Sequence, residues 1–167
     1  MMHIRIRPRT IKDLENLYSV AQTLAQHFPM SEAAVTGIYE LLLNAVEHGN
    51  LGIGFATKTA LVRQGIWLEE INRRLALPEN ADKEVEISLL RDDRQCRLTI
   101  GDQGGGFAWH KYIGKLTDSS IPNGRGLWIA LHSNFARIAF NASGNKVTCV
   151  AEYCRLGDTE SQMAGAA

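Results

Sequence analysis

Residues 38–50 read IYELLLNAVEHGN, and the rest of the chain is organised around this stretch. Its apolar residues recur at helical spacing, which predicts a helix over Ser31 to Asn50 with Ser31 as its N-cap. Glu40, Asn44 and His48 stand four residues apart and therefore form one stripe on that helix. At about 100° per residue, the stripe lies beside the apolar face rather than opposite it.

Three polar side chains at the edge of a core favour a site that faces a ligand. The alternative is an ordinary solvated face with polar groups four residues apart, and this stretch alone supports both interpretations. Glu47 is the better candidate for a solvated residue, because it points farther from the predicted core.

The composition indicates one globular domain. The 167 residues are 45% hydrophobic and 22% charged, and 18 basic residues balance 18 acidic ones. Without a basic excess, nucleic acid is not an expected partner. No apolar run reaches the roughly 20 residues of a membrane span, and the N-terminus lacks the apolar segment of a signal peptide, so we expect a soluble cytoplasmic protein. The three cysteines have neither zinc-site nor disulfide-frame spacing.

The sequence predicts helices first and hairpin-paired strands afterwards. A short edge strand, His3 to Arg7, precedes a helix over Ile11 to Phe28 that Thr10 caps. Another helix is predicted from Asn123 to about Phe135. Alternating patterns predict four later strands, at residues 84–90, 96–101, 137–141 and 146–153. An amphipathic sheet needs helices on its apolar face, so we expect an α+β fold arranged as a two-layer sandwich.

A single domain over residues 1–156 is expected, with a flexible tail at 157–167. Residues 55–77 form a predicted helical segment with apolar residues on one side and charges on the other. We interpret it as a core-packing helix, with a partner or dimer surface as the alternative. Gly65 lies inside this segment and would weaken a continuous helix by about 1 kcal/mol relative to alanine.

Two glycine-rich segments carry the remaining candidate ligand chemistry. Asp102 ends a strand and precedes three glycines at 104–106, which leave room for a planar base or a phosphate near the backbone. Gly124-Arg125-Gly126 stands at a predicted helix start, where unpaired N–H groups favour an anion. The alternatives are a tight turn and an ordinary loop-to-helix junction. Residues 107–122 read as a long loop, and the P-loop and dinucleotide-binding motifs are absent.

Three blocks, in this order, resemble motifs of the GHKL ATPases, which have the Bergerat fold. Glu40-x-x-x-Asn44-Ala45-x-x-His48-Gly49 is similar to their N box. Asp102-x-Gly104-x-Gly106-Phe107 is similar to their first glycine box, and Asn123-Gly124-Arg125-Gly126-Leu127 to their second. Within that superfamily, the first block resembles the anti-sigma-factor serine kinases and the kinase-like domains of bacterial response-regulator phosphatases. The resemblance implies a mostly antiparallel mixed sheet with helices packed on one face.

The resemblance also implies a role for each matching residue. Asn44 would coordinate Mg²⁺, and Glu40 would be the general base. Asp102 would bind the adenine amino group, with help from Gly104. The other expected ATP-binding residues are His48, Gly106, Gly124, Arg125, Gly126 and Leu127.

A lid over ATP is implied for Phe107 to Asn123. Lys111, Lys115 or Arg125 would meet the γ-phosphate, and which of the three does so stays open. The chain departs from the family pattern at Gly144-Asn145, where many relatives have Gly-Thr with the threonine near the adenine. Residues 53–82 also look like an insertion relative to the shortest anti-sigma kinases.

The resemblance implies an ATP- and Mg²⁺-dependent serine/threonine protein kinase that acts in bacterial signal transduction and transcription regulation. Its substrate would be a STAS-type anti-sigma antagonist, and the exchange of partners would control a sigma factor. One alternative is a nucleotide-gated protein-binding module with little or no kinase activity. Another is the ATPase domain of a larger two-component or phosphatase regulator. A homodimer is plausible from the resemblance alone.

Overall fold

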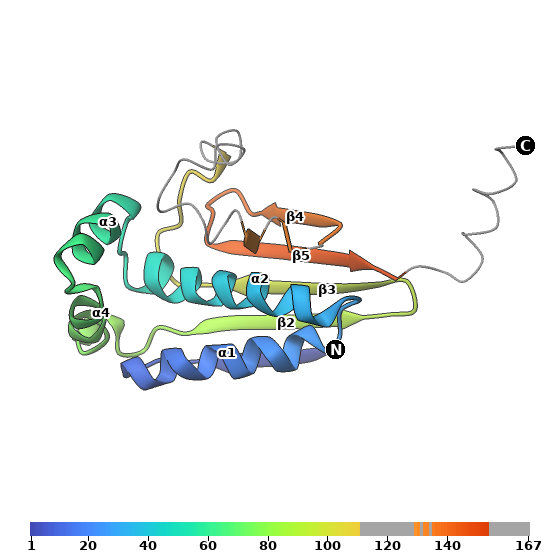
Figure 1. Ribbon diagram of the computed structural model, residues 1–167, viewed down its shortest axis with the longest axis horizontal. Helices are drawn as coiled ribbons and strands as arrows, with labels where there is room; N and C mark the ends of the chain where they lie inside the picture. Colours follow the sequence, from blue (N-terminus) through green and yellow to red (C-terminus); the bar gives the residue numbers. More distant parts are fainter. Residues whose placement is uncertain (111–128, 131, 134, 154–167) are drawn as a thin grey trace, which may run out of the picture.

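The computed structural model describes residues 1–110, 129–130, 132–133 and 135–153. The two longest described helices lie side by side along a sheet, and the shorter helices gather at one end of it (Figure 1). In chain order, the helical elements are α1 (Ile11–Ala25), α2 (Ser31–Asn44), the π-helical η1 (Ala45–Asn50), α3 (Phe55–Gln64), α4 (Trp67–Leu75) and the 3₁₀ turn η2 (Pro78–Asn80).

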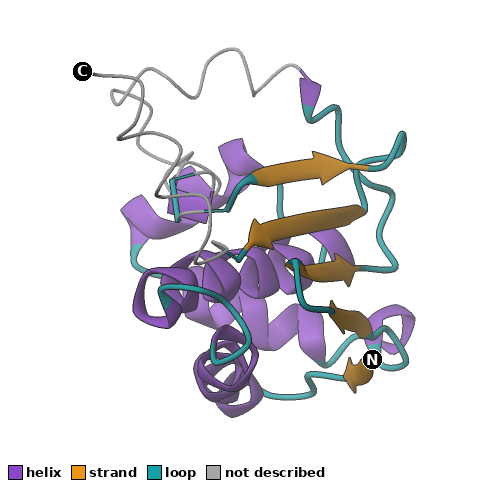
Figure 2. Cartoon of the chain, turned by 90° about the vertical axis from the view of Figure 1, so that its right-hand side faces the viewer, coloured by secondary structure: helices purple, strands orange, loops and turns teal. Residues whose placement is uncertain are grey.

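Five described strands form one sheet in the order β1-β2-β3-β5-β4. They are β1 (Met2–Ile6), β2 (Val85–Arg91), β3 (Gln95–Gly101), β4 (Arg137–Phe140) and β5 (Lys146–Glu152). All of these strand pairs are antiparallel, so the described part of the sheet lacks the parallel pair that a mixed sheet would have. The helices cover one face of the sheet (Figure 2), which confirms the predicted α+β arrangement.

The core lies between the helices and one face of the sheet. In β2, Val85, Ile87 and Leu89 are buried while Glu86 is exposed, which is the period-two pattern of a half-buried strand. The helices supply the opposite side of the core, and their largest fully buried apolar side chains include Leu17, Leu24, Ile38, Leu42 and Ile71. Since one face of each element is apolar, the two layers bury each other.

The N-terminal elements follow the prediction closely. β1 is an edge strand with Arg5 exposed to solvent. Thr10 is the N-cap of α1, and the Asp13 carboxylate accepts hydrogen bonds from the N–H groups of Arg9 and Thr10, both at 2.8 Å. The helix ends at Ala25 rather than at the predicted Phe28.

The start of α2 corrects one prediction. Ser31 is the first helical residue and not the N-cap, because Met30 takes the cap position with a φ of 57°. After Asn44 the α-helix continues as the π-helix η1, a helix type in which each N–H donates to the carbonyl five residues earlier. The N–H of Leu51 donates to the carbonyl of Val46, five residues earlier, at 2.9 Å. Such π-helical turns are rare and are frequent at functional sites.

The segment at 55–77 forms two helices rather than one. Gly65 ends α3 with a φ of 73°, in the left-handed region that favours glycine. α4 buries Ile71 and Leu75 in the core, as predicted for a packing helix. α3 buries none of its residues fully, so the core-packing interpretation holds for only part of the segment.

Several predictions concern residues outside the described ranges. The tail at 157–167 lies outside them, as does most of the helix predicted from Asn123 to Phe135, of which Ile129 and Ala130 are described and helical. Among the described residues, no helix has the length and apolar character needed to cross a membrane.

The left-handed conformation of Gly65 yields a stability prediction. Gly65→Ala is expected to lower the free energy of unfolding by about 1 kcal/mol, because alanine has a conformational cost at positive φ. Gly65→Asn should cost less, since asparagine tolerates this region better. Urea unfolding of the three proteins measures the difference. A more stable alanine variant would instead support one continuous helix through Gly65.

Candidate functional site

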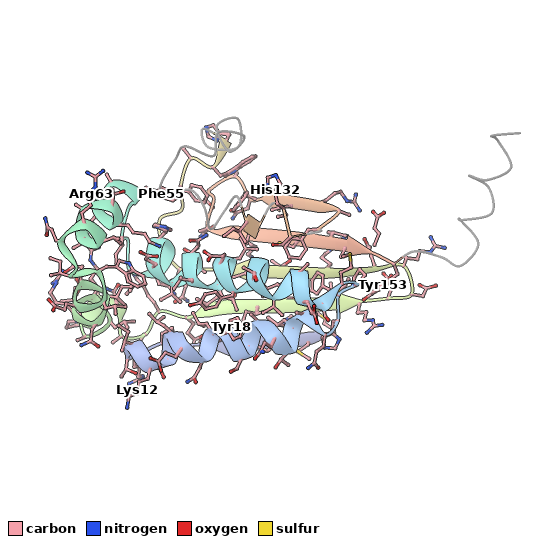
Figure 3. All side chains as sticks on the ribbon, viewed as in Figure 1. Lys12, Tyr18, Phe55, Arg63, His132 and Tyr153 are labelled. Carbon is pink, nitrogen blue, oxygen red and sulfur yellow. The ribbon has the colours of Figure 1, made fainter. Side chains whose placement is uncertain are left out.

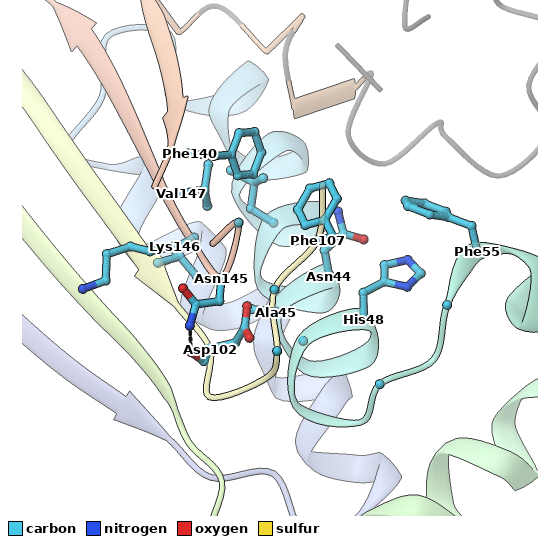
Figure 4. A pocket seen from close by; sticks show the side chains of 18 residues that line it. Asn44, Ala45, His48, Phe55, Asp102, Phe107, Phe140, Asn145, Lys146 and Val147 are labelled. Carbon is cyan, nitrogen blue, oxygen red and sulfur yellow. Dashed lines mark hydrogen bonds between the residues drawn. The ribbon is translucent and has the colours of Figure 1, made fainter. Parts of the chain in front are cut away.

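A cavity of about 350 Å³ opens between the end of the α2–η1 helix and the sheet (Figure 4). Four segments line it: the α2–η1 helix, the loop into α3, the end of β3 with the turn after it, and the β4–β5 hairpin. The lining residues are Leu41, Asn44, Ala45, His48, Gly49, Gly52, Gly54, Phe55, Ile100, Asp102, Gly105, Gly106, Phe107, Phe140, Gly144, Asn145, Lys146 and Val147.

Four of the predicted site residues meet in this cavity. Asn44 and His48 come from the α2–η1 helix, while Asp102 and Gly106 come from the turn that follows β3. Gly104 lies directly beside them, and its N–H donates to Asp102 Oδ1 at 2.8 Å. The first two sequence blocks, which are far apart along the chain, therefore form one site.

Asp102 lines the cavity and is half-buried. Its N–H donates to the carbonyl of Asn145 at 2.9 Å, so the backbone of the neighbouring hairpin fixes its position. Burial raises the pKa of the Asp102 carboxyl, while the Gly104 N–H and the Lys83 ammonium act in the opposite direction. The carboxylate is a fixed hydrogen-bond acceptor in a partly desolvated place.

The glycines around Asp102 allow close backbone contacts. A Cβ on Gly104 would lie 2.1 Å from the carbonyl oxygen of Gly49, and a Cβ on Gly49 would lie 2.2 Å from Asp102 Cγ. Gly106 has a φ of 75°, and a Cβ there would lie 1.9 Å from the carbonyl oxygen of Ser143. The expectation that Gly104 and Gly106 leave room for a ligand is therefore incomplete, because both already admit backbone of this chain.

His48 also lines the cavity, and its ring lies beside that of Phe55 at a centroid distance of 4.5 Å. Its Nδ1 is bonded to the carbonyl of Ile53, and because a carbonyl can only accept, Nδ1 carries the hydrogen. Burial lowers the pKa of His48, and the neutral ring then leaves Nε2 as an acceptor. The loop from η1 into α3 is fixed to the cavity wall by this bond.

Glu40 stands one helical turn before Asn44 and is half-buried, but it does not line the cavity itself. Among the described residues, no side chain or backbone group hydrogen-bonds its carboxylate. Burial raises the pKa of Glu40, while Lys58 lowers it and Glu47 raises it further. A carboxylate with a raised pKa can exchange a proton closer to neutral pH than an exposed one.

Glu47 contradicts the prediction of a solvated residue, since its exposed fraction is 0%. Its Oε2 accepts from Lys58 Nζ at 2.6 Å, and its Oε1 accepts from Trp67 Nε1 at 2.6 Å. The ammonium of Lys58 also lies 5.4 Å from the centre of the Trp67 ring. Helical periodicity places Glu47 on the face away from the core. In the folded chain α3 and α4 cover that face, and their position cannot be predicted from the periodicity of this helix.

Asn50 joins the end of η1 to the sheet. Its Nδ2 donates to the carbonyl of Glu84 at 3.1 Å, and its Oδ1 accepts from the N–H of Gln103 at 2.8 Å. Lys83 Nζ donates to the Asn50 carbonyl at 2.7 Å. The sequence predicts Asn50 only as the end of the helix, because its burial and its partners depend on how β2 and the turn after β3 pack against η1.

Aromatic rings form one side of the cavity. Phe107 meets Phe140 edge to face at 5.5 Å, and Trp109 stacks on Phe140 at 5.7 Å. Trp109 Nε1 donates to the carbonyl of Asn141 at 2.9 Å, which fixes the segment after the glycines to the β4–β5 hairpin. An apolar wall opposite a few polar groups is typical of small-molecule sites.

The remaining predicted site residues lie outside the described ranges. They are Lys111, Lys115, Gly124, Arg125, Gly126 and Leu127. Their place relative to the cavity therefore stays a prediction.

Among the described residues, no group of three or more histidine, cysteine, aspartate or glutamate side chains could hold a metal ion. The Asn44 side chain lines the cavity and offers an amide oxygen, a ligand type that suits Mg²⁺. Mg²⁺ commonly keeps its waters and takes only one or two protein ligands when phosphates complete its shell. The described residues of the cavity fit that mode of binding.

Comparison with known proteins found no family model that matches the chain and no match among curated proteins.

The pair of Glu47 and Lys58 leads to a prediction about folding. Lys58→Met should lower the free energy of unfolding by about 3 kcal/mol, because it leaves a fully buried carboxylate without its cation. Glu47→Gln combined with Lys58→Met should cost less than Lys58→Met alone, since the double variant has no unpaired charge. Denaturant unfolding in a double-mutant cycle measures this coupling. Additive effects would mean that the two groups do not interact in solution.

The raised pKa of Asp102 predicts how pH affects stability. The folded chain binds the proton of the Asp102 carboxyl more tightly than the unfolded chain does, so protonation stabilises the fold. This stabilisation is complete below the ordinary carboxyl pKa of about 3.9, and it is lost as pH rises through the raised pKa of the folded state. Asp102→Asn should therefore raise stability at neutral pH. Asp92→Asn should lower it, because N–H groups of Arg94 and Gln95 lower the pKa of Asp92. Unfolding followed at acidic and neutral pH tests both signs.

Proposed function

We propose that the chain is an ATP-binding protein of the GHKL type with the Bergerat fold. The observation that carries this proposal is the single cavity in which Asn44, His48, Asp102 and Gly106 meet. These residues belong to the two blocks that resemble an N box and a first glycine box. A chance similarity in two separate blocks would not require their residues to share one site.

Adenine suits the part of the cavity around Asp102. The Asp102 carboxylate offers an acceptor for the exocyclic amino group, and Ile100, Val147 and Leu41 provide apolar surface for the ring. The phosphates would then extend toward Asn44, which would hold Mg²⁺ through its amide oxygen. When bound, Mg²⁺ would neutralise charge on the phosphates.

We infer that the reaction is phosphoryl transfer to a protein serine. The serine oxygen attacks the γ-phosphorus, the bond to the β-phosphate oxygen breaks, and ADP leaves. Glu40 takes the proton of the serine hydroxyl, and the raised pKa of its carboxyl suits that role. By family resemblance the substrate is a STAS-type anti-sigma antagonist. Its phosphorylation would change which protein binds which, and this exchange of partners would control a sigma factor.

A nucleotide-gated binding module is the second candidate. It is favoured by α3 and α4, whose exposed apolar side chains include Val62 and Leu68 at 52% and 53% exposure. Phe55 begins α3 and lines the cavity, while Arg63 lies on the outer side of the same helix (Figure 3). A nucleotide that shifts Phe55 could therefore change the surface that α3 presents.

Phosphate transfer from γ-labelled Mg-ATP to a STAS-domain protein encoded near this gene tests the proposal. Asn44→Ala should weaken nucleotide binding and abolish transfer. Glu40→Gln should leave ATP affinity within about threefold of the wild type and lower the transfer rate by about 100-fold or more.

The outcomes separate the candidates. Label on a serine that depends on Glu40 supports the kinase. ATP binding without transfer favours the binding module or a different protein substrate. A wild-type chain that does not bind ATP at all would contradict both, because each depends on the cavity.

A further inference from the structure

Gly37 lies in the interior of α2 and is buried. Glycine costs about 1 kcal/mol relative to alanine at such a position, so the stability of the helix itself does not account for it. A Cβ on Gly37 would lie 2.5 Å from both Cβ and Oγ of Ser133, and 3.1 Å from Cε2 of Phe135. Alanine therefore fits at this position only if α2 and Ser133 move apart.

The two residues that approach α2 so closely belong to the segment before β4, which the structure describes at residues 129–130, 132–133 and 135. Ser133 is 6% exposed, and its Oγ donates to the carbonyl of Ile129 at 2.6 Å. The ring of Phe135 meets that of Phe28 edge to face at 5.5 Å. A methyl group added to α2 would therefore meet an anchored side chain and not the free end of a flexible one.

Gly37 shares one face of α2 with the cavity. Leu41 stands four residues later and Asn44 seven, and at about 100° per residue all three point to the same side of the helix. Leu41 and Asn44 line the cavity, which therefore begins about one helical turn, or about 6 Å, beyond Gly37. The segment before β4 accordingly packs on α2 next to the end of the cavity.

The segment before β4 also lies between two parts of the proposed site along the chain. Ile129 follows, after one intervening residue, Leu127, the last residue of the block that resembles the second glycine box. At its other end the segment leads into β4, whose last residue, Phe140, lines the cavity. A shift of the segment away from α2 would therefore move the chain at both of its ends.

We propose that Gly37 is a positioning residue of the nucleotide site. Its missing side chain sets how closely the segment before β4 docks on α2, and nucleotide binding requires that close approach. A methyl group at residue 37 would hold the two about 1 Å farther apart, because carbon atoms pack at about 3.5–4.0 Å and not at 2.5 Å. The inference rests on the proposed function, since the ligand is the nucleotide.

Calorimetry with ADP on folded variants tests this role. Gly37→Ala should weaken ADP binding about tenfold, because a displacement of this size misplaces groups that bind the ligand. Adding Ser133→Gly removes both atoms that the methyl group would meet at 2.5 Å, so the double variant should bind ADP within about threefold of Ser133→Gly alone. A role of Gly37 in the helix alone predicts no loss of affinity in Gly37→Ala and no rescue.

Thr36→Ala is the matched control, because Thr36 is exposed and stands next to Gly37 in the same helix. It raises helix propensity without approaching the segment before β4, so ADP affinity should not change. Should Gly37→Ala fail to fold, hydrogen exchange of the wild type replaces it. The N–H groups of His132 and Ser133 donate to carbonyls within their own segment, and ADP should slow their exchange about tenfold or more.

The results separate the role of Gly37 from the proposed function. Wild-type ADP affinity in folded Gly37→Ala, or a loss that Ser133→Gly does not restore, would overturn the role of Gly37. Exchange that ADP does not slow would do the same in the second experiment. ADP binding by the wild type would still uphold the proposed function in each of these cases, whereas a wild type that binds no ADP would overturn both.

Discussion

The close packing of η1 against the turn after β3 is the contact on which the site depends. Gly49 leaves no side chain between the helix and Asp102, since a Cβ there would lie 2.2 Å from Asp102 Cγ. The next residue, Asn50, then bonds to the backbone on both sides of this contact, at Glu84 and Gln103. The helix layer and the sheet are therefore held at a fixed separation at one end. The cavity lies beside this contact, and Gly49 and Asp102 both line it.

A buried charge pair fixes the outer wall of the same cavity. Glu47 lies on the side of η1 that faces away from the sheet, and its carboxylate accepts hydrogen bonds from Lys58 of α3 and Trp67 of α4. Arg74 of α4 adds a hydrogen bond to the carbonyl of Leu51 at 2.8 Å. These contacts place the start of α3, with Phe55, against His48. Removing one partner of a buried ion pair is costly, so these contacts oppose separation of the two helices from η1.

The sequence was most informative where a pattern repeats within one element. Alternation in β2 and β3 and the spacing of apolar residues in α1 predicted strands and helix to within a few residues, because each has one buried face. Of the site residues that the resemblance implies, Asn44, His48, Asp102 and Gly106 line one cavity. Glu47, Lys58 and Trp67 were not predicted as a cluster, because their contact depends on how α3 and α4 fold back. The contacts of the Asn145 amide, whose Oδ1 accepts from Asn141 Nδ2 and Ser143 Oγ, likewise arise from the folded turn and have no repeating pattern in the sequence.

The three consecutive glycines after Asp102 are not equivalent, and this has a consequence for how the protein can change over evolution. Gly104 and Gly106 each lie against the backbone of another segment, so substitution at either would disturb the fold. A Cβ on Gly105 would meet no described atom within 4 Å, and the φ of this residue is not positive. Gly105 also lines the cavity. Substitutions at Gly105 can therefore change the shape of the cavity during evolution while the fold is retained.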